Sequence, residues 1–298
     1  MNKTPKYNPF WRVCLPFILY MIIQAVVQLI VSFALVAINT EELAKVYATL
    51  SEMPTEAELT TVIASMTTIM MEVILERYVE ITGIIALCTI PIMAVFFRND
   101  RKREKELNLP VNLKASAKKY VFLPILGIAI CLGFNCLIMM TNLAFLSGSY
   151  LESSGLFYSA SFPVQIVCIG IIVPISEELL FRGVIFKRFR EVARFKKAAL
   201  FSALIFSLIH TNMLQMIYAL VLGMFLAYVY EKYGSFKAPV LLHISVNIVS
   251  LVCTELQILD LLYAIPMIMA IAVVICAFVG AVMFIQIQKI KEKEYSVE

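Results

Sequence analysis

Eight apolar stretches, most of them long enough to cross a lipid bilayer, constrain this chain more than any other feature. A spanning helix needs ~20 mostly apolar residues. The stretches lie at about 13–38, 80–97, 120–146, 163–186, 198–212, 213–231, 239–253 and 261–287. The fifth and seventh are short, which suggests helices that are buried or that do not fully cross. At 61% hydrophobic residues, against ~45–50% in soluble domains, the chain is predicted to be an all-α, polytopic membrane protein with about eight transmembrane helices.

The positive charges predict the orientation in the membrane, because cytoplasmic loops carry an excess of Lys and Arg. With a cytoplasmic N-terminus, the cytoplasmic segments hold 22 of the 25 Lys and Arg residues. The opposite side keeps only Lys45 and Arg77, and Arg182 lies inside a span. Both termini are therefore predicted to face the cytoplasm.

Two connecting segments stand out by their composition. Residues 39–79 are acidic and mixed, with apolar residues at helical spacing, which fits an amphipathic helix that leads into the second span. The segment RNDRKREKE, residues 98–106, is expected to be a solvated cytoplasmic loop. The seven cysteines all lie within or at the ends of apolar stretches, so they are interpreted as small core residues.

Five ionisable residues within the apolar stretches need an explanation. Such residues are costly in a bilayer and usually face the protein interior and one another, so they are functional-site candidates. In SEELLFRG, Glu178 and Arg182 are spaced i,i+4 with the acid first, the favourable order for an ion pair. Glu177 then points elsewhere and is the carboxylate left free for chemistry. Pro174 lies one turn before it and removes a backbone hydrogen bond to Gly170, so it is expected to kink the helix.

The two histidines of the chain lie in two further apolar stretches. Phe206 and His210 share one helix face in FSLIH, and His243 and Asn247 share one in HISVN. Taken singly, each is more often a satisfied core group or an interhelical hydrogen bond. At ~1.5 Å per residue, Glu177 and both of these motifs lie at similar depths, within a layer about 10 Å thick. Depth therefore permits three helices to present them to one cavity.

The three motifs EExxxR, FxxxH and HxxxN together resemble those of the CAAX-protease and bacteriocin-processing family, also called the Abi family. These are intramembrane endopeptidases that include the Ras-converting CAAX endopeptidase. Here the motifs read Glu177–Arg182, Phe206–His210 and His243–Asn247, and the resemblance covers about residues 163–253. It implies a catalytic six-span core at residues 120–298. Residues 1–119 form a two-span region that falls outside the resemblance.

The resemblance implies a role for each motif residue. Glu177 and His210 would activate a water molecule for attack on a peptide carbonyl, while His243 and Asn247 would stabilise the oxyanion. A desolvated carboxylate is a stronger base, and donors placed at a developing charge act most strongly where water is scarce. Glu178, Arg182 and Phe206 would support the site.

A metal ion is the open alternative for the water activation. Glu177, His210 and His243 could ligate zinc, since two His and one carboxylate do so in other peptidases. The HExxH arrangement is absent, and the favoured interpretation requires no cofactor.

Two other functional classes stay open. A proton-coupled secondary transporter also keeps ionisable residues at mid-membrane depth, although it usually shows paired repeats. A non-catalytic membrane partner or immunity protein could use the same scaffold, because a fold does not guarantee an activity. The expected partners are the lipid bilayer and a membrane-associated protein or peptide substrate, with no nucleic acid. The protein would lie in the plasma membrane if the host is bacterial.

Overall fold

The computed structural model describes residues 9–49, 54–106, 113–142, 148, 155–210 and 212–291. Within these residues every regular element is a helix and there is no strand. Eight of the described helices are long and apolar enough to cross a membrane. The predicted all-α, multi-pass membrane architecture is therefore confirmed. Which end of the bundle faces the cytoplasm remains a prediction.

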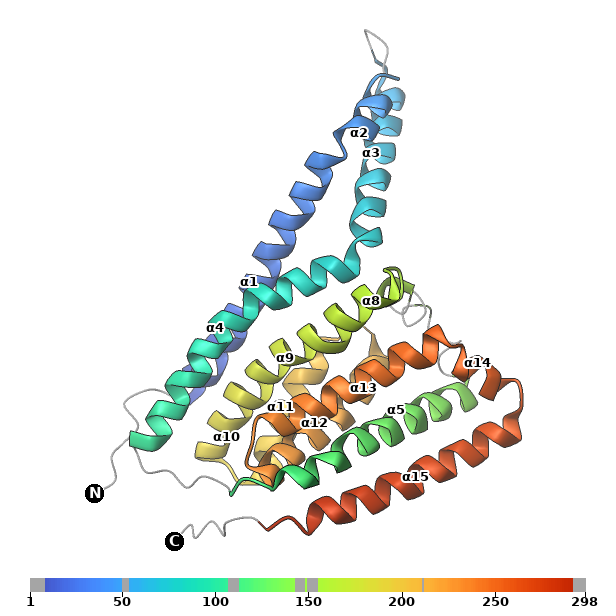
Figure 1. Ribbon diagram of the computed structural model, residues 1–298. Helices are drawn as coiled ribbons and strands as arrows, with labels where there is room; N and C mark the ends of the chain where they lie inside the picture. The colour runs from blue at the N-terminus through green and yellow to red at the C-terminus, as the bar shows by residue number, and fades with distance from the viewer. Residues whose placement is uncertain are drawn as a thin grey trace.

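The N-terminal part is built from four helices and the bundle from the others (Figure 1). The N-terminal helices are α1 (Pro9–Ile38), α2 (Thr40–Tyr47), α3 (Glu56–Glu76) and α4 (Tyr78–Glu106). The bundle helices are α5 (Phe122–Met140), preceded by the 3₁₀ turn η1 (Ala117–Val121), α8 (Phe162–Gln165), η2 (Ile166–Ile172), α9 (Val173–Glu178), η3 (Leu179–Phe186), α10 (Lys187–Val192), α11 (Phe195–Leu208), α12 (Met213–Tyr233), α13 (Lys237–Glu255), α14 (Ile258–Tyr263) and α15 (Pro266–Gln288).

The set of spanning helices differs from the predicted set at one position. Seven of the eight candidates coincide with predicted spans, but α3 also qualifies and α11, with 14 residues, does not. The hydroxyl groups of α3 explain its mixed sequence, because Thr60, Thr61, Thr67 and Thr68 each donate to the carbonyl four residues earlier. Hydroxyls satisfied in this way cost less in an apolar environment than free ones. The helix predicted within residues 39–79 is thus α3, which is separate from α4 and apolar enough to be a candidate span itself.

The N-terminal helices pack on the bundle through one shared core. Figure 1 shows α1 and α4 side by side, with α2, α3 and the upper part of α1 projecting beyond the other helices. Tyr20 of α1 and Met93 of α4 are buried with Phe181 and Phe206 of the bundle. The Tyr20 and Phe181 rings meet edge-to-face at 6.2 Å. The helix that carries the EExxxR motif is therefore covered on one side by residues from the first two predicted spans.

A second core holds the rest of the bundle together. Buried residues of α5, α12 and α13, including Leu126, Leu226 and Leu242, pack with Ile287 of α15. Helix α12 ends at Gly234, which has a left-handed conformation with φ 56°. Glycine takes this conformation without a steric penalty, and it allows the chain to reverse into α13.

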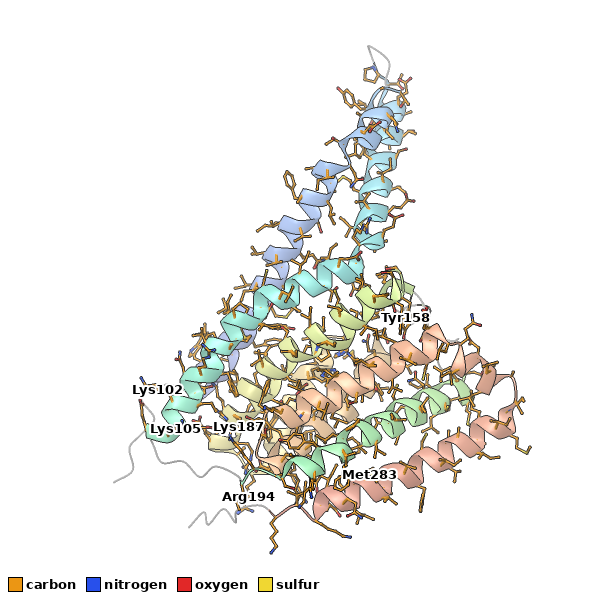
Figure 2. The ribbon with its side chains drawn as sticks, viewed as in Figure 1. Lys102, Lys105, Tyr158, Lys187, Arg194 and Met283 are labelled. Carbon is orange, nitrogen blue, oxygen red and sulfur yellow. The ribbon has the colours of Figure 1, made fainter. Side chains whose placement is uncertain are left out.

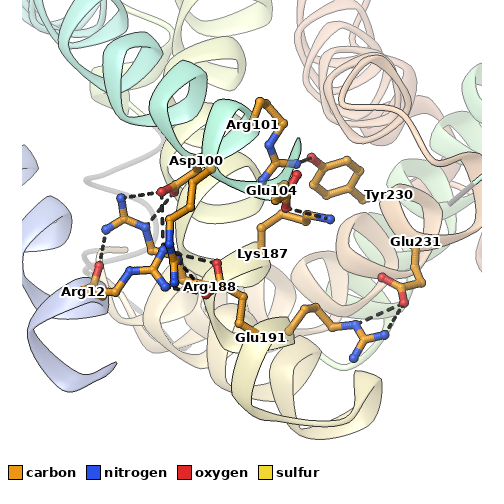
Figure 3. Close-up of polar contacts among 11 residues, drawn as sticks. Arg12, Asp100, Arg101, Glu104, Lys187, Arg188, Glu191, Tyr230 and Glu231 are labelled. Carbon is orange, nitrogen blue, oxygen red and sulfur yellow. Dashed lines mark hydrogen bonds and ion pairs between the residues drawn. The ribbon is translucent and has the colours of Figure 1, made fainter. Parts of the chain in front are cut away.

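One end of the molecule gathers most of the described charged side chains. Figure 2 shows Lys102 and Lys105 of α4 at the same end as Lys187 and Arg194, with Tyr158 at the opposite end. The residues of this end are tied together by ion pairs (Figure 3). The cluster, called the basic-end network, consists of Arg12, Asp100, Arg101, Arg103, Glu104, Lys187, Arg188, Arg190, Glu191, Tyr230 and Glu231.

The expectation of a solvated loop at 98–106 is wrong. Helix α4 continues to Glu106, and Asp100 and Glu104 are buried, with 6% and 7% of their surface exposed. Asp100 accepts two hydrogen bonds from Arg188, at 2.7 Å and 3.0 Å. Glu104 lies 3.3 Å from Lys187. Two acids one turn apart on α4 therefore match two bases on α10, and a buried charge needs such a partner.

We predict that Asp100→Ala destabilises the protein by about 3 kcal/mol, because it leaves the Arg188 guanidinium buried without its bidentate partner. The measurement is thermal unfolding of the purified protein in detergent. Lys102→Ala, at an exposed position two residues further along α4, is the matched control and should leave the transition in place. An unchanged transition for Asp100→Ala would contradict a stabilising role for the network.

Candidate functional site

The EExxxR motif lies on a continuous helical segment, residues 162–192, here called the motif helix. Two π-helical turns, η2 and η3, flank the short α-helical stretch α9 that carries Glu177 and Glu178. π-helical turns inside helices occur frequently at functional sites. Pro174 has no N–H to donate to the carbonyls one turn earlier. Asn247 of α13 donates to one of these carbonyls, since its Nδ2 lies 3.0 Å from the oxygen of Ile169.

Glu178 and Arg182 form the ion pair predicted from their spacing. Arg182 Nη1 lies 3.0 Å from Glu178 Oε1, and both side chains are fully buried. Arg182 Nη2 also donates to the carbonyl oxygen of Gly223 at 3.2 Å. The guanidinium stacks over the ring of Phe206, 4.3 Å from its centroid. A buried arginine needs this combination of an acid, a carbonyl and an aromatic face.

Gly223 allows this approach of Arg182 because it has no side chain. A Cβ at position 223 would lie 3.1 Å from Arg182 Nη2 and 2.9 Å from the Cβ of Ala203. Helices α11 and α12 therefore pack close together at this point, and the free carbonyl of residue 223 reaches the guanidinium. The sequence analysis missed Gly223. A lone glycine in an apolar helix was the only signal available for it.

His243 lies between the two acids of the motif helix. Its Nδ1 lies 3.0 Å from Glu178 Oε1, and its Nε2 lies 3.7 Å from Glu177 Oε2. Because a carboxylate accepts, Nδ1 carries the proton in the contact with Glu178. Glu178 therefore fixes the orientation of the imidazole, and Nε2 is directed towards Glu177. The structure thus brings Glu177 and His243 together.

His210 lies just beyond the end of α11, where its ring is fixed by the chain itself. Its Nδ1 is 2.9 Å from the carbonyl oxygen of Phe206. A carbonyl only accepts, so Nδ1 is the donor and Nε2 of the neutral ring is left as an acceptor. Phe206 packs edge-to-face on both His210, at 5.0 Å, and His243, at 5.8 Å. Phe206 therefore packs against both imidazoles and helps to hold them in place.

One cavity of about 500 Å³ joins the four predicted catalytic residues. Glu177, His210, His243 and Asn247 all line it. The side chain of Glu177 is 14% exposed, whereas Glu178 is fully buried. The two adjacent acids are thus separated by the fold, one towards the cavity and one towards Arg182, as the spacing predicts. Among the described residues, no contact links Glu177 directly to His210.

The candidate zinc ligands Glu177, His210 and His243 are not arranged as a metal site among the described residues. Within the described residues, no group of three or more His, Cys, Asp or Glu side chains is placed so that it could hold a metal ion. Glu177 and His243 are close to each other, and His210 and His243 each pack on the ring of Phe206.

The sequence analysis missed one wall of the cavity. Helix α1 contributes Tyr20, Met21, Gln24 and Gln28 to it, and α4 contributes Tyr78 and Thr82. The signal for the α1 residues was present in the sequence, because Tyr20, Gln24 and Gln28 recur every fourth residue in an otherwise apolar span.

The segment that carries the site is similar to known proteins. Residues 159–249 match the Rce1-like family, described as "Type II CAAX prenyl endopeptidase Rce1-like". The UPF0177 protein YxdF of Lactococcus lactis subsp. lactis (strain IL1403) is 40% identical over 81 residues, 27% of this chain and 44% of that protein. The protein named "Putative membrane peptidase YdiL" of Bacillus subtilis (strain 168) is 29% identical over 85 residues, 28% of this chain and 35% of that protein.

Each of these matches covers less than a third of this chain. The matched segment is less than half the length of either relative. No solved structure matches the chain. The family segment contains all three motifs and ends directly after Asn247. Residues 159–249 of this chain are therefore similar to the Rce1-like family over the segment that carries the three motifs.

Proposed function

We propose that this protein is an intramembrane endopeptidase that hydrolyses a peptide bond of a membrane-associated protein or peptide with a water activated by Glu177. The observation that carries the proposal is that the two adjacent acids have different environments. Glu178 is buried and paired with Arg182 at 3.0 Å, while Glu177 lines the cavity 3.7 Å from His243. One carboxylate is committed to structure, and the other is available as a base.

The proposed reaction begins with proton transfer from water to Glu177. The water oxygen attacks the carbonyl carbon of the scissile bond, and the carbonyl oxygen becomes an oxyanion. The proton then passes to the leaving nitrogen as the C–N bond breaks. The His210 acceptor Nε2 supports the transfer by hydrogen bonding to the attacking water. The reaction consumes one water molecule and leaves a carboxyl and an amino terminus.

His243 and Asn247 are proposed to stabilise the oxyanion. His243 donates from Nδ1 to Glu178, so it can donate from Nε2 as well only when the ring carries both protons. Asn247 uses one of its two amide hydrogens on the carbonyl of Ile169, which leaves the second for the oxyanion. Donors held in this way cost little reorganisation during the reaction.

The setting of the site supports a proposal for the substrate and the location. The cavity lies among membrane-spanning helices, so the substrate is proposed to be a protein or peptide associated with the same bilayer. The relatives named above come from bacteria. In a bacterial host, we propose the plasma membrane as the site of action.

Glu177→Gln should lower cleavage by about 10²–10⁴-fold, the range that general acid–base catalysis contributes, without loss of folded protein. Comparative proteomics of membranes that carry the intact protein or the variant should reveal a peptide that accumulates only with the variant. Glu255→Gln, at the exposed end of α13, is the control. If Glu177→Gln processes the same peptides as the intact protein, Glu177 is not the base.

Arg182→Ala should act on stability rather than directly on chemistry. It leaves Glu178 buried without its partner, a cost of about 3–5 kcal/mol. We expect a lower unfolding temperature in detergent and less folded protein in the membrane. Arg194→Ala, which removes an arginine from the turn after α10, is the comparison. A fully stable Arg182→Ala protein would mean that the buried pair is not needed for folding.

Asn247→Ala should reduce the rate by about 10²–10³-fold, the usual cost of one oxyanion donor, and Asn247→Asp should be similarly poor. The same assays with a strong chelator, together with the metal content of the purified protein, test the alternative. Activity that persists without stoichiometric metal supports the proposed water activation. Activity that is lost to the chelator and restored by zinc would falsify it and make His210 and His243 ligands.

A further inference from the structure

The cavity continues past the three motifs to a stripe of polar residues on α1. Tyr20, Gln24 and Gln28 lie at successive fourth positions, so they share one face of the helix, and all three line the cavity that contains Glu177. Helix α1 lies outside the family segment, which starts at residue 159. The stripe is therefore a property of this chain that the motif chemistry does not explain.

The two glutamines have no obvious structural purpose. A glutamine within a span commonly forms a hydrogen bond to a neighbouring helix. Among the residues that the structure describes, however, Gln24 and Gln28 make no hydrogen bond. Gln24 is half-buried and Gln28 exposed. Each amide offers two donors and one acceptor, and leaving these groups unpaired in a bilayer is unfavourable.

The middle of the stripe lies at the same depth as the proposed base. Arg188 of α10 donates to the backbone oxygen of Arg12 on α1, so this contact gives both helices a common origin. At ~1.5 Å per residue, Gln24 lies about 18 Å from that level and Glu177 about 17 Å. Gln28 lies one turn further, towards the opposite end of the molecule. A chain bound along the stripe would thus pass Glu177.

We propose that Gln24 and Gln28 form a subsite that binds the backbone of an extended, apolar peptide segment of the substrate. This inference rests on the proposed endopeptidase function and names the conformation of the substrate. The two amides are separated by about 6 Å along the helix. In an extended strand, every second residue turns its backbone groups to the same side, with a repeat of about 6.6 Å. The two spacings match closely enough for both amides to pair with one strand.

The chemistry of the reaction requires such a subsite. Within a helix the peptide groups are bonded to one another and closed to attack, so the substrate must unwind at the cleaved bond. Unwinding within the bilayer frees N–H and C=O groups that lipid cannot satisfy. Glutamine amides can donate to one and accept from the other. The isoleucines of the same cavity, such as Ile74 and Ile81, suit the apolar side chains of the segment.

The test measures peptide binding to the full chain in lipid nanodiscs. The probe is a pool of fluorescent 14-residue apolar peptides with lysines at both ends, and a second pool is N-methylated at alternate residues to remove backbone donors. Glu177→Gln serves as the background so that bound peptides stay intact. Gln24→Leu, Gln28→Leu and the double variant are compared with Gln286→Leu, a glutamine of α15 that does not line the cavity.

We expect each of Gln24→Leu and Gln28→Leu to weaken binding about fivefold, the usual effect of one lost hydrogen bond. N-methylation should weaken binding to the background protein and have no further effect on the double variant, because the same contacts are then already absent. Gln286→Leu should bind like the background. Unchanged peptide binding by the double variant overturns the subsite. Tighter peptide binding by the double variant also overturns it, and this is the result expected if the groove is a site for a lipid chain.

Binding no better than to empty nanodiscs also overturns the subsite. A separate outcome concerns only the proposed function. If binding depends on the two glutamines but the protein with Glu177 intact does not cleave the bound peptides, the subsite stands and the endopeptidase proposal fails.

Discussion

The buried ion pair between Glu178 and Arg182 is the interaction on which the site depends. Two fully buried charges inside a membrane bundle are costly, so the pair needs further partners around it. Arg182 therefore draws in the Gly223 carbonyl of α12 and the Phe206 ring of α11, while Glu178 binds His243 of α13. Glu178 Oε2 and Arg182 Nε nevertheless have no hydrogen-bond partner among the described residues. One pair thus fixes three helices, α11, α12 and α13, around the motif helix, and this same arrangement turns Glu177 to the cavity.

The sequence predicts those features of the fold that depend on residues within a single helix. Long apolar stretches and the Lys and Arg pattern predict the bundle, and i,i+4 spacing predicts the Glu178–Arg182 pair. Contacts between distant helices were less predictable. The pairing of Asp100 with Arg188, 88 positions apart, turns what looks like a solvated charge run into a buried face of α4. Charge composition alone cannot distinguish these two states, because both need hydrophilic residues at helical spacing.

The same holds for the site: its residues were predictable from the sequence, but their contacts between helices were not. Each motif residue that lines the cavity had been singled out by its chemistry and its depth. The hydrogen-bond partner of each imidazole was not predicted, because it depends on how the helices pack. The resemblance implies that Glu177 and His210 act together on the water, whereas in the structure His243 lies 3.7 Å from Glu177 and His210 binds the carbonyl of Phe206. Spacing gives the faces of a helix, and only packing decides which faces meet.

The π-helical turns connect the backbone of the motif helix to its chemistry. A wider helical turn leaves carbonyls less completely bonded, and Pro174 withholds one further donor. Asn247 donates a hydrogen bond to the carbonyl of Ile169. The side chain proposed to stabilise the oxyanion therefore also satisfies a carbonyl of the helix that carries the base. The two functions share one amide group. A substrate that draws on the second hydrogen of Asn247 therefore acts on a residue already fixed by the motif helix, and the geometry of the base and of the oxyanion donor is set by the same contact.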